Sequence, residues 1–214
     1  MSDKKIYILL TDTGTLFTRM IKLYTKQPLN HASIAFDQEL KELYSFGRKY
    51  QSIPFIGGFV KENIHSRLFR QAKCAVYSCS VSDEQFSGLQ DSISSVEQNQ
   101  KDYKYNLLGL LGVMMNKDFE RKNAYFCSQF VATILKESGI SVFEKPAALI
   151  TPQDLSEEKR FVLEYKGELQ AYPPGIFEAP FPKYQPSEKR TKRFAAINLL
   201  TVSFPTILGK GKGQ

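Results

Sequence analysis

The sequence predicts an α+β fold, in which an antiparallel sheet packs against helices that are grouped apart from the strands. Two strand-like runs, residues 31–37 and 42–48, are separated by a short polar turn and so predict a hairpin. Two amphipathic helical patterns come later in the chain, at 82–98 and 126–138. Because the strands pair as hairpins while the helices stand apart from them, the order favours α+β.

The first part of the chain reads as strand, helix and hairpin. Residues 6–10 form a short apolar run typical of a buried strand, and the polar TDTGT after it has turn chemistry. A helix is expected next and should end before Pro28, with apolar residues at helical spacing: Leu16, Met20, Leu23 and Tyr24. The β-branched and aromatic content of HASIAFD and ELYSFGR, joined by the turn QELK, predicts the two hairpin strands.

The second part adds two strands and three helices. Residues 49–70 are rich in Pro, Gly and aromatics and predict a long functional loop or an irregular strand, before a strand at about 72–81. Ser82 is a predicted N-cap, and YKYNLLGLLGVMM predicts a short buried helix. Residues 126–138 are the strongest helical pattern, with Gly139 at the expected C-terminal position. RFVLEYKG predicts the last strand.

Length and composition predict one core with a tail. The chain has 214 residues, of which 42% are hydrophobic and 24% charged, enough for one sizeable core. Its net charge is +7, and residues 183–214 contain seven basic residues and one acidic residue, a net +6. We therefore expect a domain over residues 1–182, close to neutral, and a basic C-terminal tail over 183–214.

The basic tail has a pattern that fits contact with a membrane. Cations lie on both sides of an apolar segment, Phe194–Leu208, a pattern that fits a peripheral contact with an anionic membrane. Pro205 and the β-branched residues argue against a long amphipathic helix, and the alternative is a segment packed across the body with solvated charges. The body has no recognisable nucleic-acid-binding motif, so nucleic acid is not a predicted partner.

Composition also indicates a compartment. The apolar run near the N-terminus ends at Thr11 and lacks a cleavage site, so no signal peptide is expected. The longest apolar candidate, Leu107–Met115, is far shorter than the about 20 residues of a membrane span. Three cysteines cannot all pair, which favours reduced thiols and a cytoplasmic protein. Cys74 and Cys79 lie in a strand-like run, where buried structural thiols are common.

The third cysteine, Cys127, stands where the aromatic loop AYF turns into a helical pattern. Backbone N–H groups and the helix dipole stabilise a thiolate in the first turn of a helix, and a nearby histidine lowers the thiol pKa further. The alternative is a cysteine that packs in the core, as Phe126, Phe130, Val131 and Ile134 are expected to do. The choice between the two depends on a partner for Cys127.

Only two histidines are available as that partner. His31 opens a predicted strand, where an imidazole whose second nitrogen is held by a polar neighbour makes a good general base. A capped core histidine is the alternative for His31. His65 lies in the polar stretch NIHSRLF, and we expect it to be an ordinary loop residue.

NHASIAFD, followed by ELYSF and much later by YFCSQFVATIL, resembles the circularly permuted papain-like cysteine hydrolases of the NlpC type. Lecithin retinol acyltransferase and its relatives share this order, in which the histidine strand precedes the cysteine helix. The resemblance covers roughly residues 6–155 and includes TPQDL, which is similar to a Pro-containing segment after the cysteine helix. It implies a permuted papain-like fold.

The resemblance also implies roles for individual residues. Cys127 matches the nucleophile and His31 the general base. The third residue, which orients the histidine, falls on the strand after the histidine strand, where Ser45 in LYSF is the matching position. A hydroxyl orients an imidazole more weakly than a carboxylate does, and Asp37 or Glu42 takes the role if the hairpin register differs. The alternative for Ser45 is a small strand residue.

An oxyanion donor is the remaining part of such a site. A tyrosine upstream of the cysteine helps to stabilise the oxyanion in many enzymes of this type, and Tyr103 or Tyr105 in DYKYNLLG is the weak match here. The backbone N–H of Cys127 is the stronger candidate.

The predicted function is that of a cysteine hydrolase or acyltransferase. It acts on an amide, ester or thioester of a peptide or lipid-like acyl substrate, and the implied chemistry uses no cofactor. The alternative is a non-catalytic ligand-binding module with a vestigial dyad, suggested by Ser45 in place of a stronger orienting residue. No Cys/His cluster has metal-ligand spacing, so no metal site is predicted.

Overall fold

A computed structural model describes residues 4–14, 22, 26–50, 53–106, 109, 122–140 and 143–173, with the side chains of 48–50 and 53–56 left undescribed. These residues belong to a compact unit, Met1–Pro180. The basic tail, most of the helix expected before Pro28 and most of the helix expected within 103–115 lie outside the described residues. The described part is an α+β structure, which confirms the predicted class.

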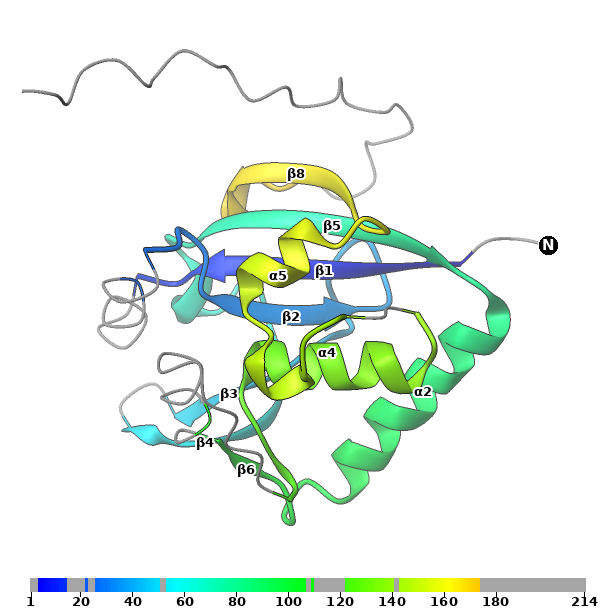
Figure 1. The fold of residues 1–214 in the computed structure, drawn as a ribbon. Coiled ribbons are helices and arrows are strands. Elements are labelled where there is room, and N and C mark those ends of the chain that lie inside the picture. Colours follow the sequence, from blue (N-terminus) through cyan, green and yellow to red (C-terminus); the bar gives the residue numbers. More distant parts are fainter. Residues whose placement is uncertain are drawn as a thin grey trace, which may run out of the picture. The chain divides into compact units, whose positions relative to one another are not determined.

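The sheet has six antiparallel strands in the order β4-β3-β2-β1-β5-β8 (Figure 1). Their bounds are β1 Lys4–Asp12, β2 His31–Ala35, β3 Leu43–Tyr50, β4 Ile53–Glu62, β5 Lys73–Val81 and β8 Val162–Glu168. β1 is central, since it pairs with β2 on one side and with β5 on the other. Both of its faces are covered, so residues 6–10 are almost fully buried, which explains why the run is continuously apolar.

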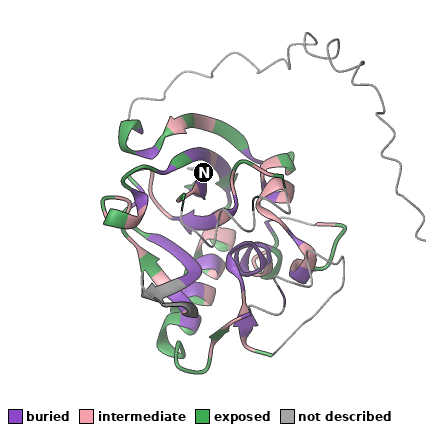
Figure 2. Cartoon of the chain, turned by 90° about the vertical axis from the view of Figure 1, so that its left-hand side faces the viewer, coloured by how far each residue is buried: buried purple, intermediate pink, exposed green. Residues whose placement is uncertain are grey.

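Alternate residues of β1 belong to two apolar clusters on the two faces of the sheet. Ile6, Ile8 and Leu10 pack with the helices, whereas Tyr7 and Leu9 pack with residues such as Phe69. This alternation is the period of two expected of a strand. Figure 2 shows the buried residues gathered in the interior and exposed residues along the outer strand β8.

Helices α2 (Asp83–Gln98), α4 (Cys127–Glu137) and α5 (Pro152–Glu157) contribute to the cluster that contains Ile6, Ile8 and Leu10. α4 contacts β2 and β3, and α2 contacts α4. β6 (Lys104–Tyr105) and β7 (Ala124–Tyr125) form a two-stranded parallel pair, and β7 lies just before α4 in the chain. The 3₁₀ turns are η1 Arg67–Phe69, η2 Ala147–Leu149 and η3 Leu169–Ala171.

Local sequence signals account for most of these elements. Ser82 caps α2 as predicted, and Gln85 at position N3 completes the capping box by reaching back to the cap. Gly139 follows α4 with φ of +65°, a backbone conformation that favours glycine. α5 was not predicted, although Thr151 and Asp154 form a second capping box around Pro152.

Residues 49–70 follow the second of the two predicted alternatives, the irregular strand. Residues 53–62 form β4, which pairs with β3 through an irregularity between Arg48 and Tyr50. Pro54 and two glycines hid the strand period in the sequence. The result is a third strand after the predicted hairpin, and its last residue, Glu62, reaches the candidate site. Among the described residues, none of the helices combines the length and hydrophobicity that crossing a bilayer requires.

Candidate active site

Cys127 is the first residue of α4, with Phe126 as its N-cap. The first N–H groups of a helix have no partner inside the helix, and the helix dipole is positive at this end. The N–H of Ser128 hydrogen-bonds to the Cys127 sulfur, and the Ser128 hydroxyl donates to the carbonyl of Ile150 at 2.7 Å. The residue that follows the thiol therefore both supports it and ties the start of α4 to the next loop.

His31, the first residue of β2, is hydrogen-bonded to Cys127. The two side chains come from positions 96 residues apart in the sequence, and the packing of α4 on β2 brings them together. Cys127 is 6% exposed. The structure thus places the predicted nucleophile and the predicted base in direct contact.

Glu62, the last residue of β4, holds the other side of the His31 ring. Its Oε1 lies 2.8 Å from Nε2 of His31, and only 7% of the Glu62 side chain is exposed. A carboxylate has no proton to donate, so Nε2 donates to it, which leaves Nδ1 as the ring nitrogen for Cys127. The three side chains form a chain of contacts from carboxylate to imidazole to thiol.

The pKa shifts in this chain favour an ion pair. Burial alone raises the pKa of the Cys127 thiol, but the hydrogen bond and charge of His31, with N–H groups of Ala32 and Ser128, lower it below its ordinary value. Burial alone lowers the pKa of His31, but the charge of Glu62 and the hydrogen bonds to Cys127 and Glu62 raise it well above its ordinary value. Both directions stabilise a thiolate beside an imidazolium.

Ser45 lies near this chain but does not hold the imidazole. Its hydroxyl is fully buried and donates to the carbonyl of Ala32 at 2.7 Å. The hydrogen bond that the sequence analysis assigned to Ser45 is made by Glu62, one strand further along the sheet. Because Ser45 Oγ is committed to a backbone carbonyl, its observed role is that of a small strand residue that joins β3 to β2.

Asp37 and Glu42, the other two predicted orienting residues, have partners elsewhere. The carboxylate of Asp37 accepts hydrogen bonds from the N–H groups of Lys41 and Glu42 at 2.9 and 2.7 Å, and so closes the hairpin turn. Glu42 pairs with Lys61 at 2.7 Å, and about half of its side chain is exposed. Neither carboxylate is among the charges that shift the pKa of His31.

The two tyrosines considered as oxyanion donors lie against different surfaces. Tyr103 stacks on Tyr125, with ring centroids 6.0 Å apart, and meets the edge of Phe46. Tyr105 packs over β4, so closely that a Cβ at Gly57 would lie 2.9 Å from its Cβ. The oxyanion role of either tyrosine stays a prediction.

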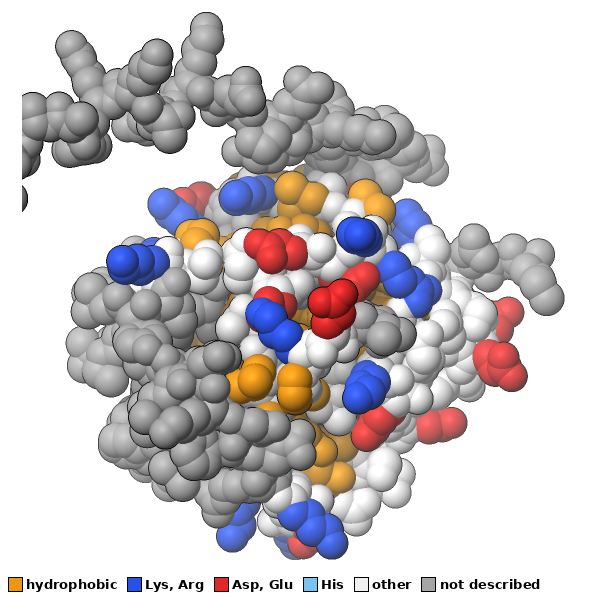
Figure 3. Space-filling model, in the orientation of Figure 1, with side chains coloured by type: hydrophobic (Ala, Val, Ile, Leu, Met, Phe, Trp, Pro, Cys, Tyr) orange, Lys and Arg blue, Asp and Glu red, His pale blue; other side chains and the backbone are white. Residues whose placement is uncertain are grey.

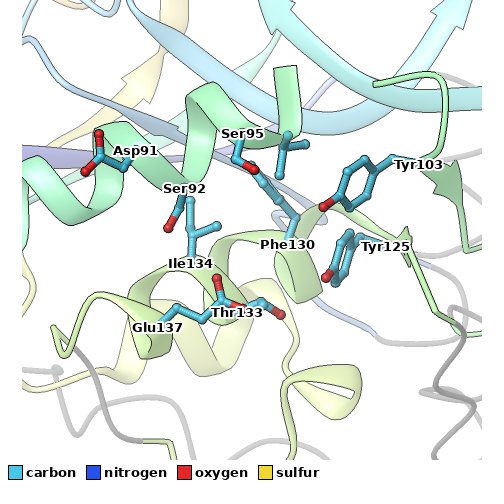
Figure 4. Close-up of a pocket in the computed structure, with 10 residues that line it drawn as sticks. Asp91, Ser92, Ser95, Tyr103, Tyr125, Phe130, Thr133, Ile134 and Glu137 are labelled. Carbon is cyan, nitrogen blue, oxygen red and sulfur yellow. The ribbon is translucent and has the colours of Figure 1, made fainter. Parts of the chain in front are cut away.

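A cavity of about 330 Å³ lies between α2 and α4 and has Tyr103 and Tyr125 at one end (Figure 4). Figure 4 shows Asp91, Ser92 and Ser95 reaching it from α2, opposite Thr133 and Glu137 of α4. Its remaining lining residues are Val96, Phe130 and Ile134. Cys127, His31 and Glu62 do not line it, so this cavity is separate from the thiol site.

The other two cysteines and the second histidine lie outside the thiol site. Cys74 and Cys79 are unpaired and buried, and burial raises the pKa of both thiols, that of Cys74 to about 12. His65 is exposed in the loop after β4.

On the face in Figure 3, the described acidic and basic side chains are interspersed, with no large patch of one sign among them.

Sequence reasoning missed Glu62 and its neighbour Ser33. Glu62 follows GGFVK within residues 49–70, for which the sequence predicts a loop or an irregular strand. The signal that points to it is the alternation of Phe59 and Lys61 with Val60 and Glu62, which places the carboxylate on the opposite face of β4 from Phe59. Ser33 has its own signal, since it lies two residues after His31 on the same strand and so on the same face.

Neither the protein-family models nor the curated proteins that were compared with this chain give a match. The geometry of the site is therefore the basis for assigning a function.

Proposed function

We propose that this protein is a thiol-dependent acyl-transfer enzyme, a cysteine hydrolase or acyltransferase, with Cys127 as nucleophile, His31 as general acid and base, and Glu62 as the residue that orients His31. The observation that carries the proposal is the contact chain Glu62–His31–Cys127, in which a buried carboxylate holds an imidazole against a thiol at a helix N-terminus. Such a chain activates a nucleophile in the way that acyl transfer requires.

We also propose that the fold is the permuted papain-like fold of the NlpC type. The strand that carries the histidine precedes the helix that carries the cysteine, and an antiparallel sheet packs against that helix. Both features support the resemblance that the sequence motifs suggest. A carboxylate at the orienting position gives the site a stronger hydrogen-bond acceptor than the serine that the motif alone supplied.

The proposed reaction begins with attack of the Cys127 thiolate on the carbonyl carbon of an amide, ester or thioester. A C–S bond forms, and the negative charge moves to the carbonyl oxygen, where the N–H of Cys127 donates a hydrogen bond. Nδ1–H of His31 protonates the leaving group as its bond to the carbonyl carbon breaks, and a thioester remains on Cys127. His31 then takes a proton from water or another acceptor, whose attack releases the acyl group and restores the thiolate.

A non-catalytic binding module is the competing interpretation. This interpretation was suggested by the weak orienting hydroxyl of Ser45. Because Glu62 and not Ser45 contacts His31, that reason no longer applies. A vestigial dyad also gives no reason to bury a carboxylate behind the histidine, since burying a charge is costly unless it is paired. The geometry therefore supports the enzyme.

The test uses p-nitrophenyl acetate as an activated acyl donor. The wild-type protein should release nitrophenolate and acquire one acetyl group on Cys127, detected by peptide mass spectrometry. Cys127→Ala should lose both signals, whereas Cys79→Ala, which removes a buried thiol elsewhere, should keep them. Undiminished acetylation and release by Cys127→Ala would exclude Cys127 as the nucleophile.

A further inference from the structure

The carboxylate of Glu62 has a second partner besides His31. The hydroxyl of Ser33 donates to Oε2 at 2.5 Å, while Nε2 of His31 contacts Oε1 at 2.8 Å. Ser33 is fully buried, and the Glu62 side chain is 7% exposed. The two oxygens of one buried carboxylate are thus held by residues i and i+2 of a single strand, which project from the same face of β2.

Glu62 reaches these residues across an intervening strand. β3 lies between β2 and β4, and Glu62 pairs with Leu43 of β3. β2 and β3 pair through Ile34 with Tyr44 and Ala35 with Leu43.

The two small residues of β3 leave the space that the carboxylate crosses. A Cβ at Gly47 would lie 3.6 Å from Cε1 of His31 and 3.7 Å from Oε1 of Glu62. The hydroxyl of Ser45 is turned to the Ala32 carbonyl. Within the described residues, Ser33 is therefore the group that fixes the far oxygen of Glu62.

A carboxylate held at one oxygen has rotational freedom about its terminal torsion, which has broad minima. A second hydrogen bond from a hydroxyl on a rigid central strand removes that freedom and satisfies a buried acceptor. The direction of Oε1 toward Nε2 then depends on Ser33, although Ser33 itself has no contact with the thiol in the geometry described.

We propose that Ser33 is a positioning residue of the thiol site, whose hydroxyl locks the Glu62 carboxylate so that Oε1 faces His31. The interaction of His31 with the Cys127 thiol then depends on Ser33. This deepens the proposed function, on which its catalytic meaning rests. Its physical content is independent of any substrate, because it concerns the ionisation of Cys127 in the resting protein.

The test measures the rate of Cys127 alkylation by iodoacetamide as a function of pH, between about pH 4 and about pH 10, which spans depressed and ordinary thiol pKa values. The peptide that contains Cys127 is quantified by mass spectrometry, so the other thiols do not interfere. Ser33→Ala should move the inflection upward by about one pH unit, which is about a tenfold loss of thiolate on the acid side of the inflection. Ser33→Thr, which keeps the hydroxyl, should restore the wild-type inflection.

Ser78→Ala is the matched control. Ser78 is also a buried serine of the sheet, and its hydroxyl donates to the carboxylate of Glu164 on the neighbouring strand. The same kind of hydrogen bond is lost in Ser78→Ala, but far along the sheet from β4. Its alkylation profile should match that of the wild type.

A double-mutant cycle with Glu62→Gln separates positioning from general weakening of the fold. If Ser33 acts through Glu62, then Ser33→Ala should add no further shift in the Glu62→Gln background. If Ser33→Ala does not fold, the pair Ser33→Thr and Ser33→Val, which differ by the hydroxyl at equal shape, gives the same comparison.

The outcomes distinguish this inference from the proposed function. An upward shift in Ser33→Ala that is absent in Ser78→Ala and in the Glu62→Gln background supports the inference. A low wild-type inflection that Ser33→Ala or Ser33→Val leaves in place overturns the inference and spares the proposed function. A wild-type inflection at the free-thiol value of about 8.5 overturns both.

Discussion

The carboxylate of Glu62 lies 2.8 Å from Nε2 of His31, although the two residues are 31 positions apart and a whole strand separates them in the sheet. Through His31 this carboxylate acts on the thiol of Cys127. Each element has a part in the arrangement: β4 supplies the charge, β3 provides the space, β2 carries the imidazole and α4 presents the sulfur. The properties of the thiol should therefore respond to changes in each of them.

Glu62→Gln should raise the pKa of the Cys127 thiol. The substitution keeps the shape of the side chain but removes the charge that favours the imidazolium, an effect of about 1 to 3 pKa units for a close opposite charge. The measurement is the pH dependence of Cys127 alkylation. Glu42→Gln is the control, because Glu42 pairs with Lys61 at the surface. A raised thiol pKa in Glu42→Gln, with no change in Glu62→Gln, would show that Glu42 and not Glu62 orients His31.

Ser45→Ala should cost stability without removing the partner of His31. It leaves the buried carbonyl of Ala32 without its side-chain donor, which predicts a loss of about 1 to 3 kcal/mol in the free energy of unfolding. Urea unfolding followed by circular dichroism measures this loss. If Ser45→Ala instead raised the thiol pKa by as much as Glu62→Gln does, Ser45 and not Glu62 would be the main orienting residue.

Gly47 should tolerate alanine but not a larger residue. An added methyl would lie at van der Waals distance, 3.5 to 3.7 Å, from Val60, His31 and Glu62, so Gly47→Ala is expected to resemble the wild type. Gly47→Val adds atoms where the imidazole and the carboxylate meet. It should lower the alkylation rate of Cys127 at about pH 6 by about tenfold or more, as expected from a rise of one unit in the thiol pKa. Equal alkylation rates in Gly47→Ala and Gly47→Val would show that the space at Gly47 is not needed for the contact between Glu62 and His31.

Brief alkylation at about pH 7 should modify Cys127 in preference to the other two thiols. Burial raises the pKa of Cys79, and that of Cys74 to about 12, so neither thiol is appreciably ionised at this pH. The pKa of the Cys127 thiol is instead lowered below its ordinary value, so this thiol reacts first. Peptide mass spectrometry before and after denaturation measures the three sites. Early modification of Cys74 or Cys79 in the folded protein would contradict this assignment.

Local signals in the sequence predicted much of the fold. The cap at Ser82, the apolar period of the two long helices and Gly139 at the end of α4 are short-range features, and they predicted elements that the structure confirms. The sequence also singled out Cys127 and His31, since a thiol at a helix start and one of only two histidines are unusual in themselves. The structure places those two side chains in contact.

The orienting residue could not be derived in the same way, because it depends on long-range pairing. Which side chain reaches His31 is set by the register of β4 on β3, and the irregularity near Tyr50 shifts that register. A shift of one residue would place Glu62 on the other face of the sheet. Ser45 is one strand closer and has a hydroxyl, but that hydroxyl donates to the backbone carbonyl of Ala32 in β2.

The most direct test of the account is the alkylation profile of Cys127 in the wild type and in His31→Ala. The thiolate forms as pH rises through the Cys127 pKa, which His31 lowers, so the wild-type inflection should lie below the free-thiol value of about 8.5. In His31→Ala the inflection should move up to that value or beyond it, because burial then acts without compensation. A wild-type inflection at about 8.5, unchanged in His31→Ala, would contradict the thiolate–imidazolium pair and with it the proposed enzyme.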